Sequence, residues 1–378
     1  MATLFDRHRL GDLELPDRVV MAPMTRVRAA ASGLATPSMA VYYAQRATAG
    51  LIISEGVQPN PVGQSNPGTP GLYTDEQMAS WRPVTDAVHA NGGRIFAQLM
   101  HGGRVSHPDT TGLQPVGPSA VAAAGKVFTP TGPQSAPARR ALETAEVSEQ
   151  ARSYAEAARR AVGAGFDGVG FDGVGFDGVG FDGVGFDGVE LHGANGCLIS
   201  QVLSSNANPR TDSYGGPIAH RIRFAVEAVA ATVDAVGAAR TAIRLSPGGT
   251  FWGVEETEVP ELYAALLAEL ARFDLAYVHL EATAEEEVLV GLRRAWPGTL
   301  IVNPVLPMGP EQADRTAADH WLGLGADLIS SGRALIANPD LIERLRIGLP
   351  VAPADETTYY QGGDAGYLTC SACQYTAA

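Results

Sequence analysis

Polar residues that could bind a ligand or take part in catalysis follow short apolar runs at regular intervals. His192 and Asn195, three residues apart, follow one such run, and Arg244 lies within another. The other positions of this kind are Thr25 and Arg26, Glu55 and Gly56, Gln98 and His101, His279 and Glu281, Asn303, and Gly332 with Arg333. If the runs are strands of one parallel barrel, these residues meet at the carboxyl ends of the strands, where barrel enzymes keep their active sites. The sequence therefore predicts one functional site built from most of the strands.

The apolar runs have the length of buried strands, and amphipathic, alanine-rich segments separate several of them. The runs are Val19–Pro23, Leu51–Glu55, Arg94–Leu99, Gly188–His192, Ala242–Ser246, Ala276–Leu280, Leu300–Asn303 and Asp327–Ser330. The helical segments are Glu149–Val162, His220–Val236, Pro260–Arg272, Glu311–Leu322 and Leu341–Ile347. Continuous apolar strands that alternate with helices indicate parallel strands covered by helices. Eight such units predict an α/β fold, a closed (β/α)8 TIM barrel rather than an open doubly wound sheet.

Two further elements are expected to flank the barrel. The segment Leu4–Arg18 carries Leu10-Gly11-Asp12 between short apolar stretches, a pattern that predicts an N-terminal β-hairpin. The connection Gly102–Ala141, after the third strand, is rich in Gly, Pro, Ala and Thr and is too long for a simple loop. We predict that it forms a capping excursion over the site. No Pro/Ser linker divides the chain, so residues 1–378 are predicted to form a single domain.

Five perfect copies of Gly-Phe-Asp-Gly-Val occupy Gly165–Val189. Perfect identity indicates recent tandem duplication. An odd period reverses the face of a strand with every copy, and one carboxylate per copy is too few for a calcium site. We predict that residues 165–184 are an inserted loop on the N-terminal face of the barrel, where each doubling of loop length costs roughly 0.6 kcal/mol. Only the last copy is followed by Glu-Leu-His, so it must supply the fourth strand.

Composition narrows the class of partner and the compartment. The formal net charge of −14 argues against nucleic acid or an anionic membrane as the main partner. The chain has no apolar run long enough to span a membrane and no apolar core of a signal peptide near its start. Cys370 and Cys373 have C-x-x-C spacing but lack the second pair of ligands that zinc needs. We predict a cytoplasmic protein without a metal site.

Several motifs, in their order and spacing, resemble the old yellow enzyme family of flavin-dependent ene-reductases. The segments that carry the resemblance are Met21–Arg26, Gln98–Leu99 with His101–Arg104, His192–Asn195, Asn208–Gly216, Arg244–Pro247, and Gly332–Arg333 with Ala337–Leu341. The resemblance implies a (β/α)8 barrel that holds FMN at its carboxyl face. It also implies an NAD(P)H-dependent flavin oxidoreductase. Such an enzyme takes hydride from NADPH or NADH and delivers it through the flavin to the β-carbon of α,β-unsaturated carbonyls or similar activated alkenes.

The resemblance places the FMN contacts at the strand ends. Thr25 corresponds to a residue whose hydroxyl bonds the flavin O4, Gln98 to a glutamine at the pyrimidine edge, and Arg244 to a cation beside N1 and O2. The other contacts that it implies are Pro23, Met24 and Gly56 through the backbone, and Gly332 and Arg333 at the phosphate. The loop after the seventh strand departs from the family's common glycine. Because Pro304 has no N–H, we expect Val305 to donate instead.

The resemblance identifies His192 and Asn195 as the pair that holds the substrate. Two donors that converge on a carbonyl or nitro oxygen stabilise the negative charge that grows as hydride reaches the β-carbon. Cys197 stands where many relatives carry a tyrosine proposed to protonate the α-carbon. A thiol is a weaker donor than a phenol, so either Cys197 or water supplies the proton, and we favour water. Met100 and Tyr360 are implied to line the substrate pocket.

Two other functions are possible for an FMN-binding barrel. In the first, the chain is a flavin-binding barrel whose catalysis is impaired by the repeats before the fourth strand. In the second, it is an FMN hydroxyacid oxidase on the same fold. That enzyme would need a histidine base paired with arginines for a substrate carboxylate, a pattern that this sequence does not carry.

Overall fold

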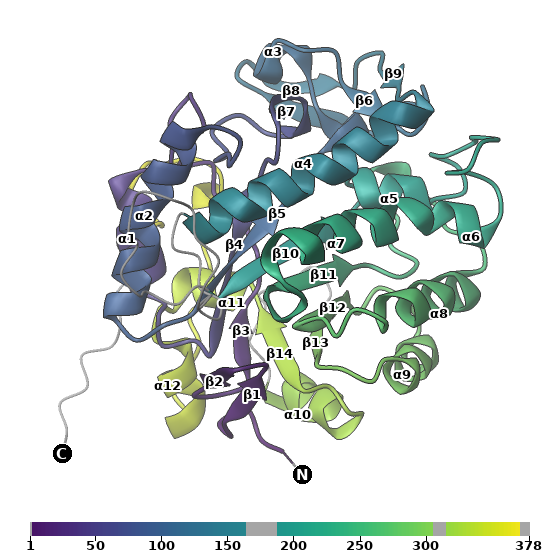
Figure 1. The fold of residues 1–378 in the computed structure, drawn as a ribbon. Coiled ribbons are helices and arrows are strands. Elements are labelled where there is room, and N and C mark those ends of the chain that lie inside the picture. The colour runs from purple at the N-terminus through teal and green to yellow at the C-terminus, as the bar shows by residue number, and fades with distance from the viewer. Residues whose placement is uncertain (1, 164–186, 305–314, 371–378) are drawn as a thin grey trace, which may run out of the picture.

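The computed structural model describes residues 2–163, 187–304 and 315–370, and it contains a closed barrel of eight parallel strands (Figure 1). In barrel order the strands are β3 (Val19–Met21), β4 (Leu51–Val57), β5 (Ile95–Leu99), β10 (Gly188–Gly193), β11 (Thr241–Leu245), β12 (Tyr277–Glu281), β13 (Leu300–Asn303) and β14 (Leu328–Ser331). Each strand pairs with its neighbours in chain order, and β14 pairs with β3 to close the ring. The predicted (β/α)8 barrel is confirmed.

Helices cover the outside of the barrel (Figure 1). The longer ones are α1 (Pro37–Ala44), α2 (Asp75–Ala90), α4 (Thr144–Gly163), α7 (Arg223–Val236), α8 (Val259–Leu270), α9 (Glu286–Ala295) and α10 (Arg315–Gly323). The shorter ones are α3 (Pro108–Thr111), α5 (Leu198–Leu203), α6 (Ile218–Arg221), α11 (Arg333–Ala337) and α12 (Leu341–Ile347). Helix α2 begins at a capping box, in which the Thr74 hydroxyl accepts from the Gln77 N–H, so its start is encoded locally.

Along each strand, successive side chains point alternately into the barrel and out toward the helices. The inward apolar layer comprises Val20, Leu51, Ile53, Phe96, Ala242, Tyr277, Ile301 and Leu328. Leu10 and Leu15 pack against this layer from the hairpin β1 (His8–Leu10) and β2 (Leu13–Leu15). The predicted N-terminal hairpin is therefore present, and it closes the amino-terminal end of the barrel with apolar contacts.

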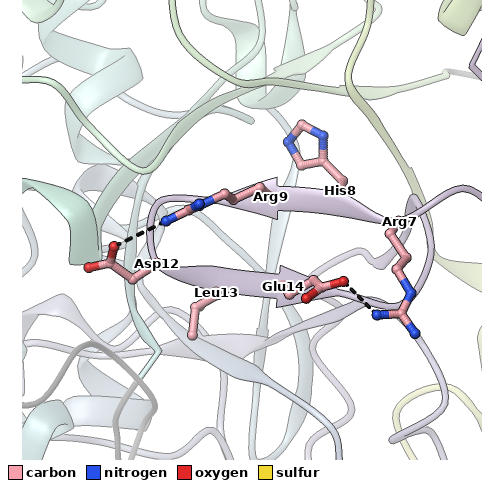
Figure 2. Close-up of a pocket in the computed structure, with 6 residues that line it drawn as sticks. All are labelled: Arg7, His8, Arg9, Asp12, Leu13 and Glu14. Carbon is pink, nitrogen blue, oxygen red and sulfur yellow. Dashed lines mark hydrogen bonds and ion pairs between the residues drawn. The ribbon is translucent and has the colours of Figure 1, made fainter.

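The outer surface of this hairpin carries a depression (Figure 2) that is lined by Arg7, His8, Arg9, Asp12, Leu13 and Glu14. Arg7 pairs with Glu14 at 2.5 Å, and Arg9 lies 3.8 Å from Asp12. All four side chains are well exposed, and exposed ion pairs contribute little free energy, ~0–1 kcal/mol. The depression lies at the end of the barrel opposite the carboxyl ends of the strands.

Three buried or half-buried aspartates fasten the starts of the strands at this amino-terminal end. Asp17 Oδ1 accepts from the N–H groups of Val19 (2.9 Å) and Gly50 (3.1 Å). Asp187 Oδ2 accepts from Ile95 (2.6 Å), and Asp327 Oδ2 accepts from Leu300 (2.9 Å). Each carboxylate thus satisfies a backbone donor of its own or a neighbouring strand, which a β-strand start would otherwise leave buried and unpaired.

Asp187 and Gly188 belong to the last of the five repeat copies, and both have a specific place. Asp187 is 1% exposed, and Gly188 begins β10 with φ +139°. A Cβ at Gly188 would lie 2.4 Å from the carbonyl oxygen of Arg240, so no other residue fits there without a shift. Residues 165–184 lie outside the described residues.

The connection between β5 and α4 forms a compact cap at the carboxyl side of the barrel (Figure 1). It contains α3, the parallel pair β6 (Val116–Gly117) and β9 (Arg140–Ala141), and the antiparallel hairpin β7 (Lys126–Thr129) and β8 (Gly132–Ser135). The buried Arg104 guanidinium donates to the carbonyls of Ala122 (3.2 Å) and Trp252 (3.0 Å). The cap is therefore fixed to the loop that follows β11, as expected for an excursion over the site. No helix among the described residues is both long and apolar enough to cross a membrane.

Candidate functional site

The strand register brings the predicted site residues to one end of the barrel. Gly56 of β4 pairs with Gln98 of β5, and His192 of β10 pairs with Arg244 of β11. Pro23, Met24 and Thr25 directly follow β3, Gly332 and Arg333 directly follow β14, and Asn195 and Cys197 lie in the turn after β10. Val305 lies outside the described residues.

The turn after β10 fixes the position of Asn195. Its backbone is left-handed, with φ +53°, a region that Asn tolerates better than most residues. Its N–H donates to Ser246 Oγ at 3.0 Å. The next residue, Gly196, has φ +69°, and a Cβ there would lie 2.5 Å from the carbonyl oxygen of Phe251. The sequence Asn-Gly therefore provides a tight turn that carries the Asn195 side chain to the end of β10, near His192.

Several polar atoms at this end are buried without a hydrogen-bond partner among the described residues. They are Nδ1 of His192, Oδ1 of Asn195, and Nε and NH1 of Arg244. The remaining Arg244 nitrogen, NH2, donates to Asn303 Oδ1 at 3.0 Å and to Glu281 Oε2 at 3.3 Å. Leaving a buried polar group unpaired costs ~1–3 kcal/mol, more for a charged one. Where several such atoms gather at the carboxyl end of a barrel, a ligand can supply the missing partners.

Burial controls the protonation of the two reactive side chains in this region. Burial, together with the nearby Arg244 charge, lowers the pKa of His192 to about 3, so its ring is neutral at physiological pH. Burial raises the pKa of the Cys197 thiol to about 12, so it is a thiol and not a thiolate. A neutral imidazole still has one N–H to donate, whereas a thiol is a weak donor.

Two glycines predicted to contact the cofactor also meet methionines. A Cβ at Gly56 would lie 2.6 Å from both Sδ and Cε of Met100, and one at Gly332 would lie 3.1 Å from Sδ of Met24. Met100 therefore packs against the backbone of β4, and the loops after β3 and β14 touch each other. Met100 is 9% exposed, so this side chain is a buried wall beside Gly56.

Two arginines after β3 hold the C-terminal segment against this end of the barrel. The buried Arg26 donates to the carbonyls of Tyr359 (3.0 Å) and Gly366 (3.0 Å) and to the Tyr42 hydroxyl (3.1 Å). Arg28 donates to the Tyr359 carbonyl as well, at 2.9 Å. The anchored segment carries Tyr360, whose side chain is 54% exposed.

Two features of this end were missed by reasoning from the sequence. The ring of Tyr360 lies 6.0 Å from that of Phe128 in the cap hairpin, so the cap reaches the C-terminal segment. Inside the barrel, the buried Glu190 accepts from Gln98 and lies beside His279. Glu190 could have been found, because it precedes His192 by two residues on a strand and must therefore share its inward face.

The donor set at the carboxyl end fits the polar groups of FMN. Two buried nitrogens of Arg244, Nε and NH1, have no hydrogen-bond partner among the described residues, and with the positive charge of the group they suit the oxygens and developing charge of a flavin pyrimidine ring. Gln98 carries both a donor and an acceptor on the adjacent part of the barrel wall. Arg333 supplies a guanidinium at the end of β14, a group well suited to phosphate.

A (β/α)8 barrel with a buried, unsatisfied polar cluster at its carboxyl face is the framework of a barrel enzyme that binds a polar cofactor. A model of the NADH:flavin oxidoreductase / NADH oxidase family matches residues 3–175 and 181–352. The chain belongs to this family, which includes the old yellow enzyme homologues described next.

Among curated proteins, 12-oxophytodienoate reductase 1 of Oryza sativa subsp. japonica is 36% identical over 370 residues, covering 94% of this chain and 89% of the relative. An old yellow enzyme homologue from Zymomonas mobilis has a solved structure with a TM-score of 0.88 and 34% identity, covering 98% of this chain and 100% of the other. Morphinone reductase, solved in complex with tetrahydroNAD, is 38% identical with a TM-score of 0.88, covering 99% of this chain and 98% of the other. The predictions of an NAD(P)H-dependent flavin oxidoreductase with FMN, and of an alkene reductase, are confirmed.

Proposed function

We propose that His192, Asn195 and the surrounding strand ends are the active site at which this chain reduces α,β-unsaturated carbonyls or similar electron-poor alkenes. The observation that carries the proposal is a cluster of buried polar atoms on His192, Asn195 and Arg244 that have no hydrogen-bond partner among the described residues. These three residues lie on or just after the neighbouring strands β10 and β11. Bound FMN supplies the chemistry of accepting hydride from NADPH or NADH and passing it to an alkene.

Residues from six of the strand ends would hold FMN. Arg244 would face N1 and O2, Gln98 the rest of the pyrimidine edge, and Thr25 would donate its hydroxyl to O4. Pro23, Met24 and Gly56 would contact the ring through their backbones, and Gly332, Arg333 and Val305 would bind the phosphate. The unpaired Arg244 donors support this assignment, because a cation with free N–H groups stabilises negative charge at the pyrimidine ring.

His192 and Asn195 would bind the carbonyl or nitro oxygen of the alkene. Because the pKa of His192 is lowered to about 3 by burial and by Arg244, the ring acts as a neutral donor and not as an acid. The Asn195 amide supplies a second donor when its nitrogen faces the oxygen. Donors that are already in place stabilise the oxygen charge that develops during hydride transfer, and each is worth ~2.7–4 kcal/mol.

The proton for the α-carbon would come from water. Cys197 is buried, and burial raises the pKa of its thiol to about 12. This thiol therefore stays protonated, but it gives up its proton with difficulty and is a weak hydrogen-bond donor. Met100 and Tyr360 would line the pocket in which the alkene and the water lie.

The first four copies of the repeat, residues 165–184, would be an inserted loop on the N-terminal face of a single domain that spans residues 1–378. The start of β10 at Gly188 supports this proposal, since it lies at the amino-terminal end of the barrel. Strand β10 pairs in register with β5 from Gly188 and with β11 from Val189, so nothing in the described part of the chain favours impaired catalysis. The net charge of −14 disfavours nucleic acid as a partner. We propose a cytoplasmic enzyme that acts on small molecules.

The visible spectrum of the purified protein tests the proposed function. We expect a flavin spectrum that NADPH or NADH bleaches under anaerobic conditions and that an enone such as cyclohexenone restores. A protein whose flavin is bleached but is not reoxidised by any enone would contradict the alkene substrate. A variant that lacks residues 165–184 should show the same turnover as the full chain, and a marked gain on deletion would instead support impaired catalysis.

A further inference from the structure

The interior of the barrel contains a chain of hydrogen bonds that the roles above do not use. Gln98 Nε2 donates to Glu190 Oε1 at 2.8 Å, and Glu190 Oε2 lies 2.8 Å from His279 Nδ1. On the other side of the ring, His279 Nε2 lies 2.8 Å from Ser330 Oγ. Glu190, His279 and Ser330 are at most 1% exposed, so water does not reach them freely.

Ser330 links these hydrogen bonds to Arg244 through its backbone carbonyl and not through its hydroxyl. Asn303 Nδ2 donates to the Ser330 carbonyl at 2.9 Å, and Asn303 Oδ1 accepts from Arg244 NH2 at 3.0 Å. Gln98 and Arg244, the two residues proposed to face the flavin pyrimidine ring, are therefore the two ends of one chain. Between them it passes through β10, β12, β14 and β13, so it crosses the interior of the barrel.

A small residue makes this crossing possible. Glu190 on β10 pairs in register with Ala242 on β11, and both belong to the inward-facing side of their strands. Because Ala242 has only a methyl group, the Glu190 carboxylate reaches past β11 to His279 on β12. A larger inward side chain at residue 242 would fill the space through which this contact is made.

The charge of Glu190 determines how the Gln98 amide is turned. Burial alone would raise the pKa of Glu190, but the His279 ring and its hydrogen bond hold it below its usual value, so the group is a carboxylate. An ionised carboxylate only accepts hydrogen bonds. The Gln98 amide must therefore turn its nitrogen toward Glu190, which leaves Oε1 and the second N–H for another partner.

We propose that Glu190 and His279 are positioning residues that fix the donor and acceptor orientation of the Gln98 amide toward the flavin and link it to Arg244. The inference rests on the proposed function, because Gln98 is placed against FMN there. A side-chain amide without such a partner can bind in two orientations that exchange oxygen and nitrogen. The chain from Glu190 to Ser330 holds one of them, so the site is already complementary to one edge of the ring before FMN binds.

A double-mutant cycle on FMN affinity tests the coupling. The apoproteins of the full chain, Gln98→Met, Glu190→Gln and the double variant are titrated with FMN, and binding is followed by flavin fluorescence. We expect Glu190→Gln to weaken binding about tenfold, the scale of a lost hydrogen bond to a charged group. Because Glu190 acts through Gln98, the double variant should bind no more weakly than Gln98→Met alone. Additive losses would overturn the proposal.

A matched control and a second readout separate positioning from a general folding effect. Glu256 is a half-buried carboxylate that accepts from Gly248 N–H and the Tyr263 hydroxyl outside this chain, so Glu256→Gln should leave FMN affinity unchanged. In Glu190→Gln, loss of a buried negative charge should also make the midpoint potential of the bound FMN more positive. Unchanged affinity and potential in a folded Glu190→Gln variant would contradict the proposal.

The outcomes distinguish this inference from the function on which it rests. If Gln98→Met binds FMN as tightly as the full chain, the proposed placement of Gln98 is wrong and the inference falls with it. If Gln98→Met weakens binding but Glu190→Gln does not, only the inference is wrong. Should Glu190→Gln lack the circular dichroism of the native protein, His279→Asn takes its place. That variant keeps a donor for Glu190 but loses the hydrogen bond to Ser330, so we expect FMN to bind about threefold more weakly. Unchanged FMN binding would refute the coupling.

Discussion

Two sets of buried polar groups, one at each end of the barrel, differ in whether the fold supplies their hydrogen-bond partners. At the amino-terminal end, Asp17, Asp187 and Asp327 each accept hydrogen bonds from backbone N–H groups of strand starts. At the carboxyl end, His192 and Arg244 keep buried atoms that no described residue satisfies. The hydrogen bonds at the amino-terminal end offset the free-energy cost of burying polar groups. At the carboxyl end that cost is not offset by the described residues.

This difference separates stability from function within one chain. A polar group whose hydrogen-bond partners are all supplied by the protein stabilises the folded state, so its removal should lower the free energy of unfolding. A buried group without a partner lowers stability unless a ligand completes it. The carboxyl end is therefore where binding and catalysis should be lost on mutation, and the amino-terminal end is where stability should be lost.

The largest effect that this comparison predicts is on catalysis at the carboxyl end. His192→Ala should lower kcat/KM for an enone by ~100- to 1000-fold, because it removes one donor to the oxygen that gains charge, worth ~2.7–4 kcal/mol. Steady-state rates with cyclohexenone and NADPH measure this loss. FMN content and the midpoint of thermal unfolding should stay close to those of the unmodified chain. A loss below about threefold would show that His192 does not hold the substrate.

The next largest effect is on stability at the amino-terminal end, and the repeats provide a matched control. Asp187→Ala leaves the buried Ile95 N–H without its acceptor, so we expect it to lower the free energy of unfolding by ~1–3 kcal/mol. Asp177→Ala changes the same residue within the same pentapeptide, one of the surplus copies. If residues 165–184 are an inserted loop, this change should cost under ~0.5 kcal/mol in urea unfolding. Equal losses in the two variants would mean that the surplus copies are built into the fold.

The strands and the strand-end residues could be predicted from the sequence because their signals are local. Leu300–Asn303 was predicted with its observed bounds, and Gly188–His192 ends one residue before β10 does. A buried strand of a parallel sheet is a continuous apolar run, and the residue that follows it faces the site whatever the other strands do. The place of His192 at a strand end could therefore be predicted without knowing how the neighbouring strands pair.

The contacts between strands could not be predicted in this way. The bond from Gln98 to Glu190 depends on the register of β5 against β10, and the contact of Glu190 with His279 depends on the small Ala242 between them. Likewise, the ring contact of Phe128 with Tyr360 joins segments more than 200 residues apart in the sequence. Register and docking are set by the packing of the whole chain, and no local pattern encodes them.

A smaller effect is expected at Cys197. Cys197→Ala should keep kcat for cyclohexenone within about threefold, because water and not the thiol supplies the proton. Cys370→Ala, which changes the half-buried cysteine of the C-terminal segment, is the control for loss of a thiol. A loss of more than about a hundredfold in Cys197→Ala alone is the scale of general-acid catalysis and would identify the thiol as the donor.

The smallest effect is expected on the protonation of His192, whose ring should not titrate near neutral pH. The pKa of His192 is lowered from its usual value to about 3, so the neutral ring persists as the pH falls from 8 to about 4. The sign follows from the two causes, burial and the Arg244 charge, which both disfavour the protonated ring. Nitrogen-15 NMR of the histidine rings in the holoprotein measures this, with His192→Asn to assign the signal. A His192 ring that titrates near pH 6.5 would show that this end of the barrel is open to water, and that its unpaired atoms are solvated and not reserved for a ligand.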